Sequence, residues 1–138
     1  MTKTATKLSI IFSSDLKHID KTAEETKLFL AGLGKKDHTF TILLIIREAL
    51  INATIHGNRC DAQKKVTFEI EYQNNKFVIQ VIDNGPGFDY EKIFKKQQDT
   101  SLESGRGLFI MKTYASKVNY NKKGNHLTIE MLIDKQTT

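Results

Sequence analysis

The 138-residue sequence contains a single cysteine, Cys60, and a single proline. One cysteine excludes an internal disulfide and a cysteine-rich zinc site. One proline and 8 glycines exclude collagen-like and proline-rich linker sequences. The longest apolar run, Ile42 to Ile46, is far too short to span a bilayer, and no signal-peptide pattern is visible. We therefore expect a cytoplasmic protein with no membrane partner.

The composition is typical of one globular domain, which we expect to cover residues 1–138. Hydrophobic residues make up 39% of the chain and charged residues 27%, which argues against disorder. The formal net charge is +5, but the lysines are scattered along the chain. Aromatic residues do not alternate with Arg or Lys as they do in platforms that stack bases. Direct binding of nucleic acid is therefore not expected.

The first half of the sequence predicts a strand and then two helices. The strand is Leu8 to Phe12, and the helix after it begins at a capping Ser14 or Asp15 and ends at Gly32 or Gly34. One face of this helix carries Leu16, Ile19, Ala23 and Leu30.

A second and longer helix is predicted from a capping Asp37 to about His56, with Gly57 as its stop. Its pattern of apolar residues repeats with the period of a helix, and no proline interrupts it. The apolar positions of this helix include Phe40, Leu43, Leu44, Ala49 and Ile51. We expect one continuous helix over this stretch.

The period then changes to two, which predicts a β-hairpin. Apolar and polar residues alternate over Val66 to Tyr72 and again over Phe77 to Val81. Asn74-Asn75 between them suits a tight turn, because asparagine tolerates a positive φ. The second strand leads directly into a loop at 83–88.

The last part of the chain predicts one more helix and one more hairpin. The segment 95–104 is polar with little periodicity, and we expect it to be mobile. The next helix opens at 105–107 and buries Leu108, Met111 and Ala115, and strands at 118–120 and 127–133 follow. Because hairpins dominate, we expect an α+β fold with a mostly antiparallel sheet and the helices on one face.

The first cluster of chemically interesting residues is Glu48, Asn52 and His56. Their spacing of four places them on one face of the long helix. A carboxylate and a carboxamide one turn apart can hold a hydrated divalent ion or aim a base at a hydroxyl. A solvent-facing polar stripe is the alternative, although the neighbours are mainly Ile, Leu and Ala. We interpret His56, beside Gly57, as a cap of the helix C-terminus.

The second motif, Asp83-Asn84-Gly85-Pro86-Gly87, directly follows a predicted buried strand. Gly85 and Gly87 let the backbone turn sharply and approach a ligand closely. Asp83 can accept a hydrogen bond from an exocyclic amine such as that of adenine. An ordinary Asp-Asn-Gly-Pro turn is the alternative.

The third motif, Gly105-Arg106-Gly107-Leu108, opens the last helix. Unpaired N–H groups and the positive end of the helix dipole suit phosphate there, and Arg106 adds a charge. The motif is not a Walker A loop, because no Gly-Lys-Ser/Thr follows, and no strand leads directly into it as in a Rossmann fingerprint. Phosphate binding is the function that this motif favours.

In this order, the three motifs resemble the conserved boxes of the GHKL, or Bergerat-fold, ATPase superfamily. Residues 47–57 resemble the N box, 83–87 the G1 box and 105–108 the G2 box. The chain is most similar to the anti-sigma factor serine/threonine kinases of bacterial partner-switching systems. The resemblance covers nearly the whole chain and implies a two-layer α/β sandwich that binds ATP and Mg²⁺.

The resemblance also implies a role for each motif residue. Glu48 is the implied general base, and Asn52 the implied Mg²⁺ ligand. Asp83 is implied to bind the adenine amine. The residues implied to shape the nucleotide pocket or to close over the phosphates are Gly85, Gly87, Gly105, Arg106, Gly107 and Leu108.

The implied function is a protein kinase that phosphorylates a serine or threonine of an anti-anti-sigma, STAS-type antagonist. Such a protein also sequesters a sigma factor or a comparable regulator, and a homodimer is a family expectation. The main alternative is a non-catalytic ATP-binding module that switches partners without phosphoryl transfer. A detached catalytic domain of a histidine kinase is a third possibility.

Overall fold

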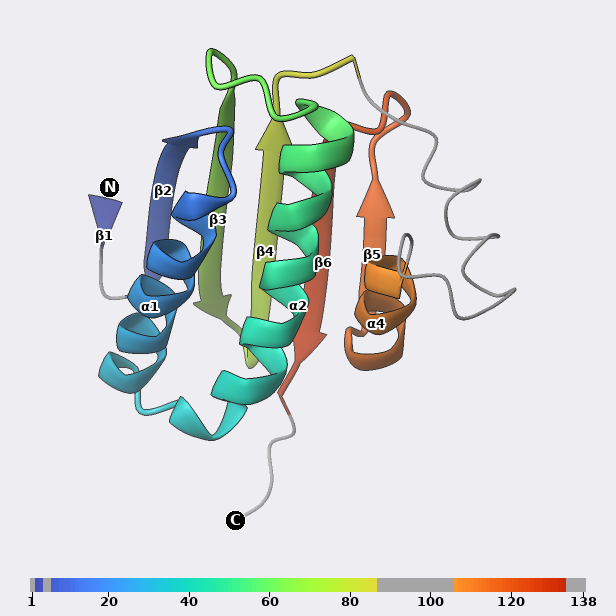
Figure 1. Cartoon of the computed structure of the whole chain (residues 1–138). Helices are drawn as coiled ribbons and strands as arrows, with labels where there is room; N and C mark the ends of the chain where they lie inside the picture. The colour runs from blue at the N-terminus through green and yellow to red at the C-terminus, as the bar shows by residue number, and fades with distance from the viewer. Residues whose placement is uncertain (1, 4–5, 87–105, 134–138) are drawn as a thin grey trace.

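The computed structural model describes residues 2–3, 6–86 and 106–133, and their main feature is a six-stranded antiparallel sheet. The strand order is β1-β2-β3-β4-β6-β5, and Figure 1 shows the helices together on one face of the sheet. The predicted two-layer α+β arrangement is therefore confirmed.

The strands are β1 (Thr2–Lys3), β2 (Lys7–Ser13), β3 (Lys65–Gln73), β4 (Lys76–Asp83), β5 (Lys117–Tyr120) and β6 (His126–Leu132). The helices are α1 (Lys17–Gly32), the 3₁₀ turn η1 (Lys36–His38), α2 (Thr39–Ile51), the π-helical turn η2 (Asn52–Gly57) and α4 (Arg106–Tyr114). The short β1 was not predicted, because two residues carry no periodic signal.

The hairpin of β3 and β4 forms as predicted, and its register places the end of β4 beside the start of β3. Asn74 and Asn75 both have a positive φ, of 52° and 60°, as a tight turn between twisted strands requires. The strand register pairs Val66 with Asp83, so Asp83 lies level with the start of β3. The alternate residues that point toward the helices are buried: Val66, Phe68, Ile70, Phe77, Ile79 and Val81.

The core lies between the sheet and the helices, and α2 contributes most to it. The fully buried residues of α2 are Ile42, Ile45, Ile46, Ala49 and Leu50. By contrast, Phe40 is 79% exposed at the first turn of α2, and Leu43 and Leu44 are only partly buried. The inner face of α2 is therefore set by residues 42, 45, 46, 49 and 50.

One predicted helix cap is confirmed and the other is wrong. The first helix begins at Lys17, after Leu16, which is 46% exposed and lies outside the buried face. Asp15 Oδ1 accepts a hydrogen bond of 3.0 Å from Lys17 N–H at the start of α1, so the predicted capping by Asp15 is confirmed. Asp37 lies in η1 and does not cap α2.

The predicted long helix changes its winding at Asn52, which the sequence did not indicate. Asn58 N–H donates to the carbonyl of Ala53 at 2.8 Å, five residues back, as in a π-helix. The wider turn shifts the side chains after Asn52 relative to a continuous α-helix, so Ile55 is 38% exposed. Such π turns are frequent at functional sites.

The stretch Lys36–Gly57, with a mean hydropathy of 1.3, is long and apolar enough by composition to cross a membrane. Half of its 18-residue apolar window is buried inside the fold, where α2 packs over the sheet. A core helix of a globular protein passes the same test, so this stretch alone is weak evidence for a membrane span.

A matched pair of substitutions tests this placement of the core. We expect Phe68→Ala to lower the free energy of unfolding by about 3–5 kcal/mol, because it empties a fully buried site in β3. We expect Phe40→Ala to change it by about 0.5 kcal/mol or less, because Phe40 is exposed. Urea unfolding measures both, and similar losses from the two variants would contradict the arrangement of α2.

Candidate functional site

The end of the long helix meets the end of β4, where Gly57 of η2 lies against Asp83 and Gly85. Asp83, the last residue of β4, is only 4% exposed, and its carboxylate lies against Gly57, the last residue of η2. Gly85 is buried against the main chain of Gly57. The structure therefore brings together Asp83 and Gly85, which sequence reasoning proposed as part of one site.

This junction has no room for a side chain at either glycine. A Cβ on Gly57 would overlap the Asp83 carboxylate, and a Cβ on Gly85 would overlap the carbonyl of Gly57. Gly57 was predicted only as a helix stop. Gly57 also lies directly against the Asp83 carboxylate. The sequence around Gly57 does not indicate this second role, because the contact is with a distant strand.

The carboxylate of Asp83 is only partly satisfied within the protein. Its Oδ1 accepts a hydrogen bond of 2.8 Å from Gly85 N–H, while Oδ2 has no donor among the described residues. Burial raises the pKa of Asp83, and the Gly85 N–H and the charges of Lys64 and Lys123 oppose this rise. Asp83 is thus a buried acceptor with one oxygen left for a ligand.

The turn between β5 and β6 supports Asp83 from one side. Asp83 N–H donates to the carbonyl of Asn125 at 3.0 Å. That turn is itself held by Asn121, whose Oδ1 accepts hydrogen bonds from the N–H groups of Gly124, Asn125 and His126 at 2.8, 2.9 and 3.1 Å. The backbone of Asp83 is therefore fixed by a turn with its own internal bonds.

A small cavity of about 10 Å³ lies beside the Asp83 carboxylate. It has room for about one water molecule. Its walls combine aliphatic side chains with a few polar groups, and its lining residues are Ala49, Ala53, Val81, Asp83, Tyr120, Asn125 and Leu127. A cavity of this size holds a water and not a base, so its apolar walls describe only the surroundings of Asp83.

Asn52 begins the π turn, one helical turn after Glu48. Asn52 is 6% exposed, and its side-chain Nδ2 has no hydrogen-bond partner among the residues that the structure describes. A buried polar group left unpaired is uncommon and indicates a site that a ligand or water completes. Glu48 is partly buried on α2. This pair therefore remains a candidate for metal and base chemistry.

The described residues contain no group of three or more His, Cys, Asp or Glu side chains placed to hold a metal. A hydrated Mg²⁺ does not require such a group, because it keeps several waters and is held by few protein oxygens plus phosphates. The carboxamide oxygen of Asn52 is the kind of hard ligand that this ion takes. The residues present fit a phosphate-bound Mg²⁺.

The third motif is described only in part. Its first residue, Gly105, lies outside the described residues. So do Gly87 of the second motif and the segment 95–104, which we predicted to be mobile. The helix α4 begins at Arg106, as predicted, so Arg106, Gly107 and Leu108 form its first turn. Further along α4, Met111 is fully buried and α4 packs against α2. The contact of phosphate with residues 105–108 stays a prediction.

The predicted role of His56, as a cap of the helix C-terminus, stays a prediction. It is partly buried at the end of η2, and burial lowers the pKa of its imidazole. Asn58, directly after η2, also binds its surroundings through its side chain, and sequence reasoning did not single it out.

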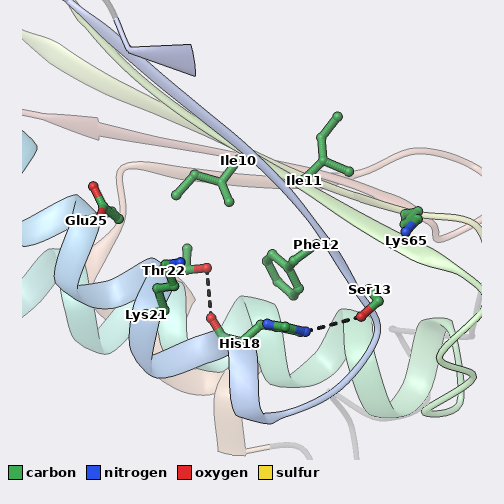
Figure 2. Close-up of a pocket in the computed structure, with 9 residues that line it drawn as sticks. All are labelled: Ile10, Ile11, Phe12, Ser13, His18, Lys21, Thr22, Glu25 and Lys65. Carbon is green, nitrogen blue, oxygen red and sulfur yellow. Dashed lines mark hydrogen bonds between the residues drawn. The ribbon is translucent and has the colours of Figure 1, made fainter. Parts of the chain in front are cut away.

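A separate groove of about 380 Å³ lies between α1 and β2, and Figure 2 shows its lining. Phe12 points toward α1, and His18 Nε2 lies 3.2 Å from Ser13 Oγ. Lys21, Lys65 and Glu25 bring charges of both signs to its edge. None of the predicted site residues lines this groove, so it is independent of the Asp83 site.

Comparison with known proteins agrees with this geometry. Residues 12–131 match the family model described as "Histidine kinase-like ATPase domain". Two proteins named "Anti-sigma F factor", from Clostridium perfringens strains SM101 and 13, are 33% and 34% identical over 109 residues, which is 75% of this chain and 78% of theirs.

Among solved structures, the histidine kinase domain of the Erythrobacter litoralis EL346 blue-light activated histidine kinase is similar to this chain. The TM-score is 0.56 at 16% identity, over 96% of this chain and 66% of that one. At this identity the likeness concerns the fold alone. It confirms the predicted type of fold, in which the helices cover one face of the sheet.

Replacing Gly57 tests the close contact with Asp83. We expect Gly57→Ala to lower the free energy of unfolding by about 1–3 kcal/mol, because the new methyl group overlaps the carboxylate. Gly32→Ala is the matched control: a Cβ there meets nothing within 4 Å, so we expect a change of about 1 kcal/mol or less, toward stability. Equal losses in urea unfolding would contradict the contact.

The pKa of Asp83 predicts a pH-dependent cost to folding. Because the folded pKa lies above the ordinary value of 3.8, the protein loses stability as the pH rises from 3.8 through the folded pKa. We expect Asp83→Asn, which can still accept from Gly85 N–H, to avoid this loss and to be more stable than the parent at neutral pH. The difference in unfolding free energy, measured from pH 4 to 7.5, should grow with pH. A constant difference would contradict the raised pKa.

Proposed function

The chain belongs to the histidine kinase-like ATPase domain family, and we propose that it is an ATP-binding anti-sigma factor with protein kinase activity. The observation that carries the proposal is the buried Asp83 carboxylate, which has one free oxygen beside an apolar cavity at the end of β4. The relatives named anti-sigma F factor support the regulatory role. We also propose a cytoplasmic location, which is where a regulator of a sigma factor would act.

Asp83 is proposed to select the base of the nucleotide. Its Oδ2 accepts a hydrogen bond from the exocyclic amine of adenine, and Gly57 and Gly85 keep the space around the carboxylate narrow. A hydrogen bond to a charged group is worth about 1.5–3 kcal/mol, or roughly ten- to a hundredfold in affinity. A base with a carbonyl in place of the amine meets the carboxylate as a second acceptor and is disfavoured.

The phosphates are proposed to lie along α2 and the start of α4. Asn52 would hold Mg²⁺ through its carboxamide oxygen, and its buried Nδ2, which has no partner among the described residues, could donate to a phosphate oxygen or a water. The chemistry that the ion would supply is neutralisation of phosphate charge. Arg106, Gly107 and Leu108, with Gly105 before them, would present the N–H groups of the α4 N-terminus to the phosphates.

Glu48 is proposed to be the catalytic base. ATP is a substrate here, and its γ-phosphoryl group passes to a serine or threonine hydroxyl of a STAS-type antagonist. The hydroxyl oxygen bonds to the γ-phosphorus, the bond to the β-γ bridging oxygen breaks, and ADP leaves while Glu48 takes the hydroxyl proton. Glu48 precedes the proposed metal ligand by one helical turn, which suits a base near the γ-phosphate.

The proposed partners are the antagonist and a sigma factor or comparable regulator, with a homodimer as a further expectation. The relatives' name is the support for the sigma factor. The second candidate function is a non-catalytic ATP-binding module that exchanges the same partners. The presence of Glu48 favours the kinase, since ATP binding alone does not require a base at this position.

Exchanging the carboxylate of Glu48 for an amide separates the two functions. We expect Glu48→Gln to bind ATP almost normally and to slow phosphorylation of the antagonist by roughly 10²–10⁴-fold, because ATP itself offers no proton to a base. The assays are ATP affinity and transfer of labelled phosphate at saturating ATP and Mg²⁺. Glu24→Gln makes the same change at an exposed position of α1 and should affect neither.

The outcomes distinguish the alternatives. Transfer by Glu48→Gln at the parent rate would eliminate the general-base role. Loss of ATP binding in the same variant would make Glu48 a residue that organises the metal site. Absence of transfer in the parent protein, with ATP still bound, would favour the non-catalytic module.

A further inference from the structure

Asn58 is completely buried at the point where three segments of the chain meet. It follows η2 directly, and its main-chain N–H closes the π turn by donating to Ala53. Its side chain reaches the two other segments, the start of β3 and the turn that follows Asp83. A buried carboxamide at such a junction links segments that are distant in the sequence.

The side chains of Asn58 and Asn84 form a closed set of hydrogen bonds with the backbone. Asn58 Oδ1 accepts from Asn84 N–H at 2.9 Å, and Asn58 Nδ2 donates to the carbonyl of Lys65 at 2.9 Å. Asn84 Oδ1 accepts from Lys65 N–H, also at 2.9 Å. The first of these bonds holds the peptide immediately after Asp83.

The chain is thus fixed on both sides of the Asp83 carboxylate. Asp83 N–H is bonded to the carbonyl of Asn125, and the next N–H, that of Asn84, is bonded to Asn58. The N–H after that, of Gly85, donates to Asp83 Oδ1 itself. Because three consecutive N–H groups are bonded, the direction of Asp83 Oδ2 depends on each of their three acceptors. Of these acceptors, Asn58 Oδ1 is the one at the end of the helix.

We infer that Asn58 is a positioning residue that holds the Asp83 turn in place and thereby sets the preference of the site for adenine. This inference rests on the proposed role of Asp83 in base recognition. Asn58 itself does not touch the base. Asparagine suits the position because its carboxamide both accepts and donates, which neither aspartate nor a hydrophobic residue of similar size can do.

A purely structural role for Asn58 predicts a different result. Loss of its bonds would then lower stability without changing which nucleotide is preferred. A positioning role changes the ratio of affinities for ATP and inosine triphosphate, which carries a carbonyl where adenine has its amine. This ratio is insensitive to a uniform loss of stability, because both nucleotides bind the same folded protein.

The experiment compares the parent, Asn58→Ala and Thr26→Ala. Thr26 is also fully buried, and its hydroxyl donates to the Thr22 carbonyl within α1 at 2.8 Å, so its removal destabilises the protein without touching the site. We expect the parent to prefer ATP by at least tenfold. We expect Asn58→Ala to lose roughly tenfold in ATP affinity and most of the preference, and Thr26→Ala to retain both.

A second measurement needs no variant. Amide hydrogen exchange of the nucleotide-free parent should show the Asn84 N–H protected well above an open turn, because Asn58 Oδ1 binds it. Unprotected exchange at Asn84 would overturn the inference even if Asn58→Ala fails to fold. So would an unchanged preference in folded Asn58→Ala.

The two proposals fail in distinguishable ways. A parent protein that binds ATP and inosine triphosphate equally would overturn base selection by Asp83, and the positioning role with it. A parent that prefers ATP, combined with an Asn58→Ala variant that prefers it equally, would overturn the positioning role alone. Loss of the preference for ATP in Thr26→Ala would show that the ratio of the two affinities merely follows stability. That result would also overturn the positioning role of Asn58.

Discussion

The contact on which the site depends is that of the Asp83 carboxylate with the main chain at Gly57. It joins the end of the long helix to the end of β4, and it exists only because glycine occupies positions 57 and 85. The close approach removes water from one side of the carboxylate. This burial raises the pKa of Asp83, and it also makes the remaining oxygen a stronger acceptor for a ligand.

The same burial sets stability against function. A largely buried charged group opposes folding at neutral pH, and a folded protein tolerates it where the rest of the core is well packed. Here the core under the site is supplied by fully buried residues of α2, β3 and β4. Asn52 Nδ2, which has no partner among the residues that the structure describes, is a second polar group whose burial opposes folding. In the proposed function, both residues belong to the nucleotide site.

Asparagines rather than charged residues hold the backbone around the site. Asn121 organises the β5–β6 turn that bonds to Asp83, and Asn58 bonds to the peptide that follows Asp83. A neutral carboxamide can satisfy buried N–H and C=O groups together without adding a charge that would compete with the carboxylate. The electrostatic character of the pocket is therefore left to Asp83, with Lys64 and Lys123 at its edge.

Alternating residues were enough to predict β3, β4 and their hairpin, because these two strands lie on a core that buries every second side chain. Asp83, Gly85 and the start of α4 followed from motifs whose chemistry is local. The sequence did not predict three kinds of feature: the exposure of Leu16 and Phe40, the π turn at Asn52, and the hydrogen bonds of Asn58. Each depends on what a distant segment places beside the residue, and a periodic pattern says nothing about that partner. The sequence by itself thus determined the elements and the acidic group of the site, whereas the packing of η2 against β4 decided how that group is buried, held and directed.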